Sequence, residues 1–275
     1  AARLRKAGVR EAELDAWYLL EWASGVSRSH YLANPEEKLG EEQERRFSEG
    51  LAKREKRIPL QYITGEQEFM GLSFLVNDQV LIPRQDTEIL VEEALKYLKP
   101  GMRVLDLCTG SGCILLSLLH FCPEAEGTGA DLSRGALETA GRNCERLGIQ
   151  AELVQGDLFE NIEGTFDLIV SNPPYIRRAE IQELMEEVRC REPYMALDGH
   201  EDGLYFYRRI AEEAPRYLKP GGLLCLEIGF DQAESVSGLL RDRGFGEIET
   251  VRDLAGLDRV VRGRRGPGGT EEKEN

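Results

Sequence analysis

The chain has 275 residues, which is enough for one large domain or for a large domain with a small accessory one. Its composition, 41% hydrophobic and 31% charged, is typical of a globular protein, and no apolar run reaches the length of a membrane span. The net charge of −15 argues against an extended nucleic-acid interface, because such interfaces rely on Lys and Arg that neutralise phosphates.

The six cysteines indicate a reduced protein without a metal centre. None belongs to a C-x-x-C pair, and His30, His120 and His200 show no ligand spacing. We therefore expect no metal site, cysteines that pack as small core residues, and a cytoplasmic location. The chain begins at Ala1 rather than Met, so we expect its natural start to lie upstream.

Residues 1–58 are predicted to form a small helical domain. Leu14, Trp17 and Tyr18 recur at helical spacing, and Gly25 is a suitable helix end. A charged, helix-favouring run follows, and no catalytic cluster is evident.

Residues 59–85 are predicted to form a β-hairpin linker, because short apolar strands are interrupted at Gly71. A helix over 88–98 is expected next, capped by Asp86 or Thr87.

From residue 86 to 262 apolar strands alternate with helices, which predicts a doubly wound α/β domain with a mostly parallel sheet. The last two strands follow one another closely and are expected to pair antiparallel at an edge. The Gly-, Pro- and charge-rich residues 263–275 are predicted to be disordered. Strands are expected at 102–107, 126–131, 151–155, 166–171, 222–228, 246–251 and 258–262, and helices at 112–121, 134–147, 203–217 and 231–242.

Small residues at 108–112 form the turn after the first strand of this domain. They allow close backbone approach to a ligand, and the N–H groups at the start of the next helix favour an anion. A dinucleotide fingerprint would need a glycine where Leu115 stands, so NAD is disfavoured but stays open. Asp131, after the second strand, lies where an acid binds ribose hydroxyls, and Asp157 follows the third strand.

An acidic residue after each of three strands, beside a small-residue turn, resembles the S-adenosyl-L-methionine site of class I methyltransferases. The resemblance implies that Asp106 supports the turn and contacts the ammonium group, and that Asp131 binds the ribose. It also implies that Asp157 accepts from the adenine amino group while Leu158 packs on the ring. Read singly, these acids are equally well helix caps and loop residues. The expected cofactor-binding set is Asp106, Cys108, Thr109, Gly110, Ser111, Gly112, Asp131, Leu132, Asp157, Leu158 and Asn172.

The sequence Asn172-Pro173-Pro174-Tyr175 follows the predicted strand 166–171. Two prolines cannot continue strand pairing, so the chain leaves the sheet at its carboxyl edge, where open α/β sheets place ligands. There Asn172 and the proline carbonyls offer acceptors for a planar –NH2 group, and Tyr175 offers a flat ring. The alternative is an ordinary turn with a buried tyrosine.

This motif is similar to that of methyltransferases acting on nitrogen attached to a planar carbon. Further segments resemble the family of peptide chain release factor N5-glutamine methyltransferases, over about residues 10–262. These segments are 59–65, 68–69, 81–88, Val188, 192–193, 196–199, 202–204 and 253–261. Cys108, Leu158 and Gln85 depart from the family pattern, which has glycine, often an aromatic residue, and proline there.

The resemblance implies a class I S-adenosyl-L-methionine-dependent methyltransferase fold, Rossmann-like, with a seven-stranded sheet and a helical N-terminal domain that docks the release factor. The implied substrate is the glutamine of the Gly-Gly-Gln motif of class I release factors, and S-adenosyl-L-homocysteine is the implied second product. Direct binding to nucleic acid or membrane is not expected.

Asn172 Oδ1 and the Pro173 carbonyl are expected to accept the two amide hydrogens of the substrate, with Tyr175 as a wall. No histidine lies near the motif, so the proton is expected to leave to water. Arg84, Glu88 and Phe69 border the site or serve only to join the domains. The expected catalytic residues are Asn172, Pro173 and Tyr175, and the expected substrate-binding residues are Asn172, Pro173, Pro174, Tyr175, Phe69 and Arg84.

Two other functions stay open at this point. An N6-adenine methyltransferase acting on DNA or RNA would need a basic face, which the net charge disfavours. A non-catalytic cofactor-binding module would show damage to the cofactor turn or to Asn172, and neither is seen.

Overall fold

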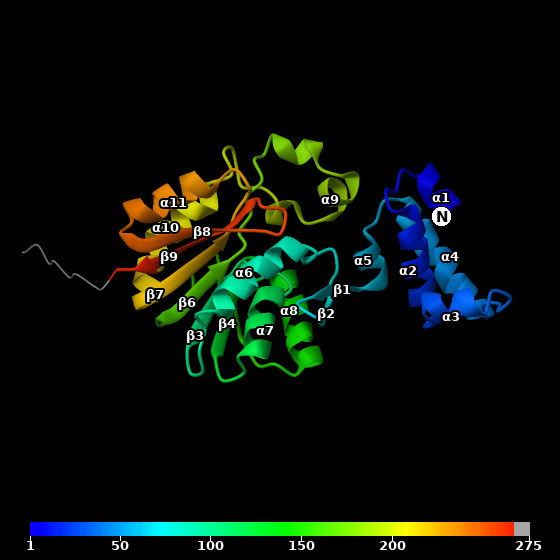
Figure 1. The fold of residues 1–275 in the computed structure, drawn as a ribbon, viewed down its shortest axis with the longest axis horizontal. Coiled ribbons are helices and arrows are strands. Elements are labelled where there is room, and N and C mark those ends of the chain that lie inside the picture. Colours follow the sequence, from blue (N-terminus) through cyan, green and yellow to red (C-terminus); the bar gives the residue numbers. More distant parts are fainter. Residues whose placement is uncertain (267–275) are drawn as a thin grey trace, which may run out of the picture.

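The computed structural model describes residues 1–266 of the chain. A helical N-terminal part is joined through a short β-hairpin to a larger α/β part (Figure 1). Most of the predicted disordered tail, residues 267–275, lies outside the described residues.

Five helices build the N-terminal part: α1 (Ala2–Lys6), α2 (Ala12–Ser24), α3 (Arg28–Ala33), α4 (Glu41–Glu55) and α5 (Leu60–Thr64). They enclose a small core that includes Leu19 and Leu51. Leu14 and Tyr18 belong to the same apolar stretch of α2 but are exposed. Gly25 ends α2 in the left-handed conformation, where the absence of a Cβ removes the steric penalty.

The linker contains two antiparallel strands, β1 (Glu66–Phe69) and β2 (Leu72–Leu75). Met70 and Gly71 both have positive φ, the geometry of a tight two-residue hairpin turn. Glu88, on helix α6 (Gln85–Leu95), accepts a 2.7 Å hydrogen bond from the Met70 N–H and so fixes this turn to the α/β part.

Helix α6 begins at Gln85, three residues before the predicted start, with Arg84 as its N-cap. Asp86 and Thr87 therefore lie in the first turn and do not cap the helix. Thr87 is buried, and its hydroxyl instead contacts Asn172, a partner 85 residues away in the sequence.

Seven strands form one sheet in the order β5-β4-β3-β6-β7-β9-β8. Neighbours from β5 to β7 are parallel, and β9 is antiparallel to both β7 and β8. The predicted antiparallel pair is confirmed, with β8 at the edge. The strands are β3 (Arg103–Leu107), β4 (Glu126–Asp131), β5 (Glu152–Gln155), β6 (Phe166–Ser171), β7 (Leu218–Glu227), β8 (Phe245–Arg252) and β9 (Asp258–Arg265).

Strand β9 extends through Arg265, so the prediction that the disordered tail begins at residue 263 is wrong for 263–265. Both neighbouring strands supply partners there: Arg264 pairs with Leu223 of β7, and Arg265 pairs with Phe245 of β8. Backbone pairing on two sides outweighs the composition of this segment.

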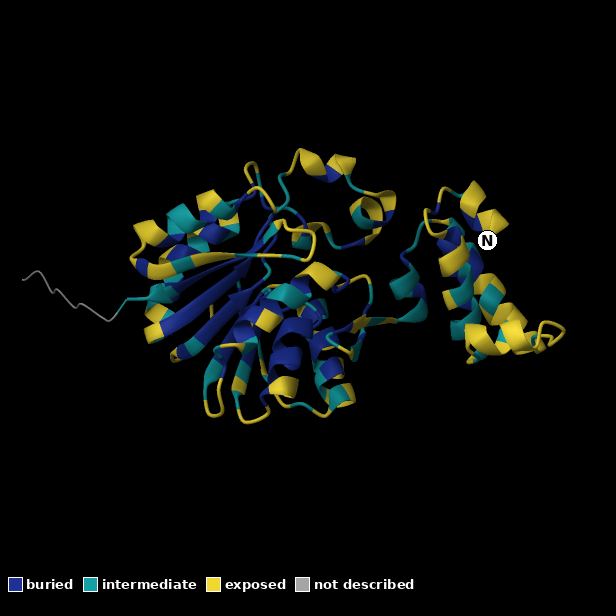
Figure 2. Ribbon diagram, viewed as in Figure 1, coloured by how far each residue is buried: buried dark blue, intermediate teal, exposed yellow. Residues whose placement is uncertain are grey.

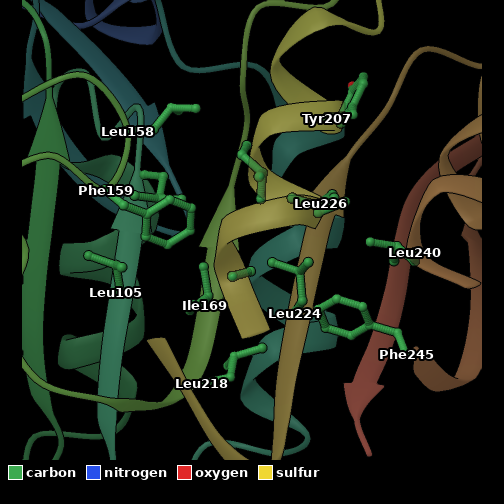
Figure 3. Packing of buried hydrophobic residues seen from close by; sticks show 14 of the residues in the cluster. Leu105, Leu158, Phe159, Ile169, Tyr207, Leu218, Leu224, Leu226, Leu240 and Phe245 are labelled. Atoms are coloured by element: carbon green, nitrogen blue, oxygen red, sulfur yellow. The ribbon is translucent and has the colours of Figure 1, made fainter. Parts of the chain in front are cut away.

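Helices cover both faces of the sheet (Figure 1). Helices α6, α7 (Cys113–Phe121) and α8 (Arg134–Leu147) lie on one face, and α10 (Tyr205–Tyr217) and α11 (Ala233–Asp242) lie on the other. The central strands are buried along most of their length (Figure 2). Figure 3 shows the α10–α11 side, where Leu158, Phe159 and Tyr207 pack in one cluster with Leu226.

A long segment between β6 and α10 contains α9 (Glu186–Arg191) and two short 3-10 turns, Glu180–Glu183 and Tyr194–Ala196. It lies at the carboxyl edge of the sheet, where the parallel strands all end.

Within residues 1–266, no helix combines the length and the apolar character needed to cross a membrane. The same residues contain no group of three or more His, Cys, Asp or Glu side chains that could hold a metal ion.

Candidate active site

One cavity opens at the carboxyl edge of the sheet, and most of the predicted site residues line it. From the predicted set these are Arg84, Cys108, Thr109, Gly110, Ser111, Asp131, Leu132, Asp157, Leu158, Asn172 and Pro174. Residues that the sequence did not single out as ligand-binding complete the lining, among them Gln79, Val80, Leu81, Pro83, Thr87, Ser133, Pro193, Met195, Ala196 and Phe206. Of the predicted residues, Asp106, Gly112, Pro173, Tyr175 and Phe69 are not part of the wall.

The turn at 108–112 is strongly curved, because Cys108, Gly110 and Gly112 all have positive φ. For Cys108 this conformation is strained, because its Cβ is disfavoured at a φ of 58°. Burial raises the pKa of the Cys108 thiol, which favours its protonated form.

Asp106 lies beneath the turn and is fully buried. Its Oδ2 accepts a 2.6 Å hydrogen bond from the Thr109 hydroxyl, which supports the turn. Burial raises the pKa of Asp106 to about 7, against the lowering effect of Thr109. Oδ1 is buried and has no hydrogen-bond partner among the described residues.

Asp131 ends β4 and ties two loops together at the cavity wall. Its Oδ2 accepts from the Gly110 N–H at 2.9 Å, and its Oδ1 accepts from the Ser133 N–H at 2.8 Å. Burial raises the pKa of Asp131, while these two hydrogen bonds lower it. Each carboxylate oxygen keeps a lone pair, so the residue remains able to accept from ribose hydroxyls.

Asp157 is held by a partner that the sequence did not reveal. Arg209, on α10, donates from Nη1 to both carboxylate oxygens, at 2.8 and 2.9 Å. Asp157 therefore reaches the cavity as one half of an ion pair, not as a free carboxylate. Leu158 beside it is buried and has a φ of 57°, so the chain turns sharply at the predicted adenine end.

Asn172 lies directly after β6 and faces the cavity. Its Nδ2 donates to the Thr87 hydroxyl at 3.3 Å, so the two polar atoms of the amide are not equivalent. With Nδ2 committed to the protein, Oδ1 is the atom left for a ligand.

Tyr175 lies further from the cavity than predicted. Its ring packs against the α10–α11 core, and its hydroxyl donates to Glu227 Oε1 at 3.4 Å. The Tyr175 carbonyl accepts from Gln232 Nε2 at 3.1 Å. A Cβ on Gly203 would come within 2.4 Å of that carbonyl oxygen, so only glycine fits there. Tyr175 thus fixes the loop that carries Asn172, and the predicted contact between its ring and a substrate amide is not visible.

The sequence left the roles of Arg84, Phe69 and Glu88 undecided, and in the structure these residues lie in three different places. Arg84 lines the cavity and donates to the buried carboxylate of Glu192. Phe69 is 1% exposed and packs edge-on against Phe74, 6.1 Å between centroids, away from the cavity. Glu88 holds the hairpin turn. Arg84 alone therefore remains a candidate for ligand contact.

The segment between β6 and α10 also contacts the N-terminal part. Arg54 donates to Asp15 at 2.7 Å and to Glu187 at 2.9 Å, and Arg57 donates to both oxygens of Glu187. Burial raises the pKa of Glu187, but the hydrogen bonds from Arg57 and Arg54 lower it to about 2.

The lining suits S-adenosyl-L-methionine better than a dinucleotide. The Asp131 carboxylate on the cavity wall suits hydroxyl groups and would repel a pyrophosphate, whereas the charge of Asp157 is balanced by Arg209. Arg84 is a donor on the cavity wall for the cofactor carboxylate, because the N–H groups of Thr109, Gly110 and Gly112 already donate within the protein.

Two family models match the chain: the PrmC N-terminal domain over residues 1–65 and the methyltransferase small domain over residues 85–190. A release factor glutamine methyltransferase of Geobacter sulfurreducens is 47% identical, over 96% of this chain and 93% of that protein. This chain belongs to the release factor glutamine methyltransferase family. A second member, from Caulobacter vibrioides, is 43% identical over 96% of this chain and 93% of its own length.

A methyltransferase from Pyrococcus furiosus has a similar crystal structure, with a TM-score of 0.58 over 78% of this chain and 99% of that one. At 20% identity it bears on the fold alone. The predicted family, fold class and enzyme class are confirmed, and members of such methyltransferase families use S-adenosyl-L-methionine.

Proposed function

We propose that the protein transfers a methyl group from S-adenosyl-L-methionine to the side-chain N5 of the glutamine in the Gly-Gly-Gln motif of class I peptide chain release factors. The observation that carries this proposal is the placement of Asn172, with Nδ2 committed to Thr87, on a cavity whose other walls carry Asp131 and Asp157. Membership of the family supports the same reaction.

S-adenosyl-L-methionine supplies a sulfonium-bound methyl group. Among the residues of the cavity, Asp131 would hold the ribose hydroxyls, Asp157, paired with Arg209, would meet the adenine amino group beside Leu158, and the turn at 108–112 would hold the methionine end. Asp106 supports that turn from below.

The amide nitrogen of glutamine is a weak nucleophile, because its lone pair is delocalised into the carbonyl. Asn172 Oδ1, on the cavity wall, accepts one of its hydrogens, and the carbonyl of Pro173, which is not itself part of the wall, accepts the other, so the lone pair points at the methyl carbon. The new C–N bond forms as the C–S bond breaks, and the bonding electrons stay on sulfur in S-adenosyl-L-homocysteine. The nitrogen becomes positive during transfer, so both acceptors bind it more strongly in the transition state, and one N–H proton then leaves to water.

We also propose the division of labour between the parts of the chain. Residues 1–58 bind the release factor, residues 59–85 join the two parts of the chain, and residues from 86 onward carry out the methyl transfer. An apolar groove on the N-terminal part, lined by Leu14 and Trp17, supports the docking role. We expect no nucleic-acid or membrane partner and a cytoplasmic location.

The test uses labelled S-adenosyl-L-methionine and purified release factor. Label is expected on the release factor and is expected to disappear when the glutamine of its Gly-Gly-Gln motif is replaced by alanine. Label on DNA or RNA in a parallel reaction, with none on the release factor, would overturn the proposal in favour of an adenine methyltransferase.

A further inference from the structure

The orientation of the Asn172 amide decides whether the site can bind an –NH2 group. The oxygen of the amide accepts hydrogen bonds and its nitrogen donates them. If Nδ2 faced the cavity, its hydrogens would meet the hydrogens of the substrate amide, and no hydrogen bond could form. Something in the protein must therefore hold Oδ1 toward the cavity.

Thr87 is the only residue within hydrogen-bond distance of the Asn172 side chain among the described residues. A hydroxyl can either donate or accept, so by itself Thr87 would tolerate both orientations of the amide. It selects one orientation only if its single proton is directed elsewhere.

Glu227 offers the acceptor that would take this proton. It ends β7, the strand next to β6, and is 2% exposed. Its Oε1 accepts from Tyr175, whereas its Oε2 has no hydrogen-bond partner in residues 1–266. Asp86, the residue before Thr87, forms an ion pair with Arg259 at 3.2 Å, and the Arg259 carbonyl accepts from the N–H of Ile228, the residue after Glu227, so the start of α6 lies close to the end of β7.

Resting on the proposed function, we infer that Thr87 and Glu227 are positioning residues that hold Asn172 Oδ1 toward the substrate amide. Thr87 donates its proton to Glu227 Oε2, and its lone pair accepts from Asn172 Nδ2. This arrangement gives a partner to an otherwise unsatisfied buried oxygen, and it leaves the Asn172 amide a single orientation.

Ionised Glu227 is an acceptor only, whereas protonated Glu227 can donate to Thr87 and release the threonine proton toward Asn172 Oδ1. Burial raises the pKa of Glu227 to about 7, so this exchange falls in an accessible range. The other titratable or charged groups facing it are Arg259 on β9, Asp86 on α6, Tyr175 after β6, Tyr207 on α10 and Cys113 on α7.

The decisive experiment compares Thr87→Val, which removes the hydroxyl, with Thr87→Ser, which keeps it. We expect Thr87→Val to lower kcat on the release factor roughly 10- to 100-fold, since small displacements of a positioning group cost about that much. Thr87→Ser should remain within about threefold of the wild type, and both should bind S-adenosyl-L-methionine with unchanged Kd. Wild-type kcat should fall as the pH falls through about 7, and this inflection should be smaller in Glu227→Gln, which retains only the titration of Asp106 in this range.

A double-mutant cycle separates positioning from a general structural effect. In an Asn172→Ala background, Thr87→Val should have no further effect on kcat, because no amide is left to orient. Wild-type kcat in the Thr87→Val variant, or a loss that persists undiminished in the Asn172→Ala background, would overturn the inference. Failure of the wild type to label the release factor would instead refute the proposed function.

Discussion

Replacing Glu227 by glutamine should stabilise the protein at alkaline pH and have little effect at acid pH. Glutamine has nearly the same shape but no charge, so the variant isolates the cost of a buried carboxylate. Burial raises the pKa of Glu227 from 4.5 to about 7 in the folded protein. A raised folded pKa means that the contribution to stability is fully present below pH 4.5 and is lost as the pH rises through 7.

The difference between these two pKa values corresponds to about 3 kcal/mol, at ~1.4 kcal/mol for each pH unit. The stability of Glu227→Gln relative to the wild type should therefore rise by about 3 kcal/mol between pH 4.5 and pH 8. Both proteins retain Asp106 and Asp131, so the titration of these two residues cancels in the difference between the two unfolding free energies.

Urea unfolding of both proteins from pH 4.5 to pH 8.5 measures this difference, with the exposed Glu145→Gln on α8 as a matched control. The control should show no comparable trend. Stability curves for wild type and Glu227→Gln that run parallel over this range would refute the reasoning, because they would mean that Glu227 titrates alike in the folded and unfolded states.

Three further changes test other parts of the structure. Asn172→Ala should lower kcat by about 10²- to 10³-fold with an unchanged Kd for S-adenosyl-L-methionine, measured by calorimetry; normal kcat at saturating release factor would contradict the mechanism. Arg209→Met should weaken cofactor binding several-fold, because Asp157 loses the partner that fixes its position. An unchanged Kd for S-adenosyl-L-methionine would show that the ion pair plays no part in binding. Glu187→Gln should cost about 2 kcal/mol of stability at pH 7, with the exposed Glu186→Gln as control. The lowered pKa of Glu187 means that its contribution is present above pH 4.5 and lost as the pH falls toward 2, so denaturation curves for wild type and Glu187→Gln should converge there.

Sequence patterns located the strand ends, and with them the cavity, because each parallel strand is an apolar run that stops where the chain leaves the core. Asp131 illustrates this: a strand that ends at residue 131 must place its last side chain at the carboxyl edge of the sheet. The same geometry applies to Asn172 after β6.

Partners of these residues were not predictable, because they depend on contacts between distant segments. Arg209 meets Asp157 across 52 residues, and Thr87 meets Asn172 across 85. Neither pair is close enough in the sequence to follow from a helix or strand periodicity. Glu227 did carry a readable signal, since an acid at the end of a buried predicted strand has to face the same edge as Asn172.

The segment between β6 and α10 links the N-terminal part to the cavity wall. Glu187 in α9 binds Arg54 and Arg57 of the N-terminal part, and a few residues later Pro193 and Met195 line the cavity. A release factor bound to the N-terminal part would therefore be connected, through the segment between β6 and α10, to the cavity wall beside its glutamine. The turn at 108–112 follows β3 and does not belong to the segment between β6 and α10. Removing the Glu187 ion pairs by Glu187→Gln should therefore raise KM for the release factor, while the Kd for S-adenosyl-L-methionine stays constant.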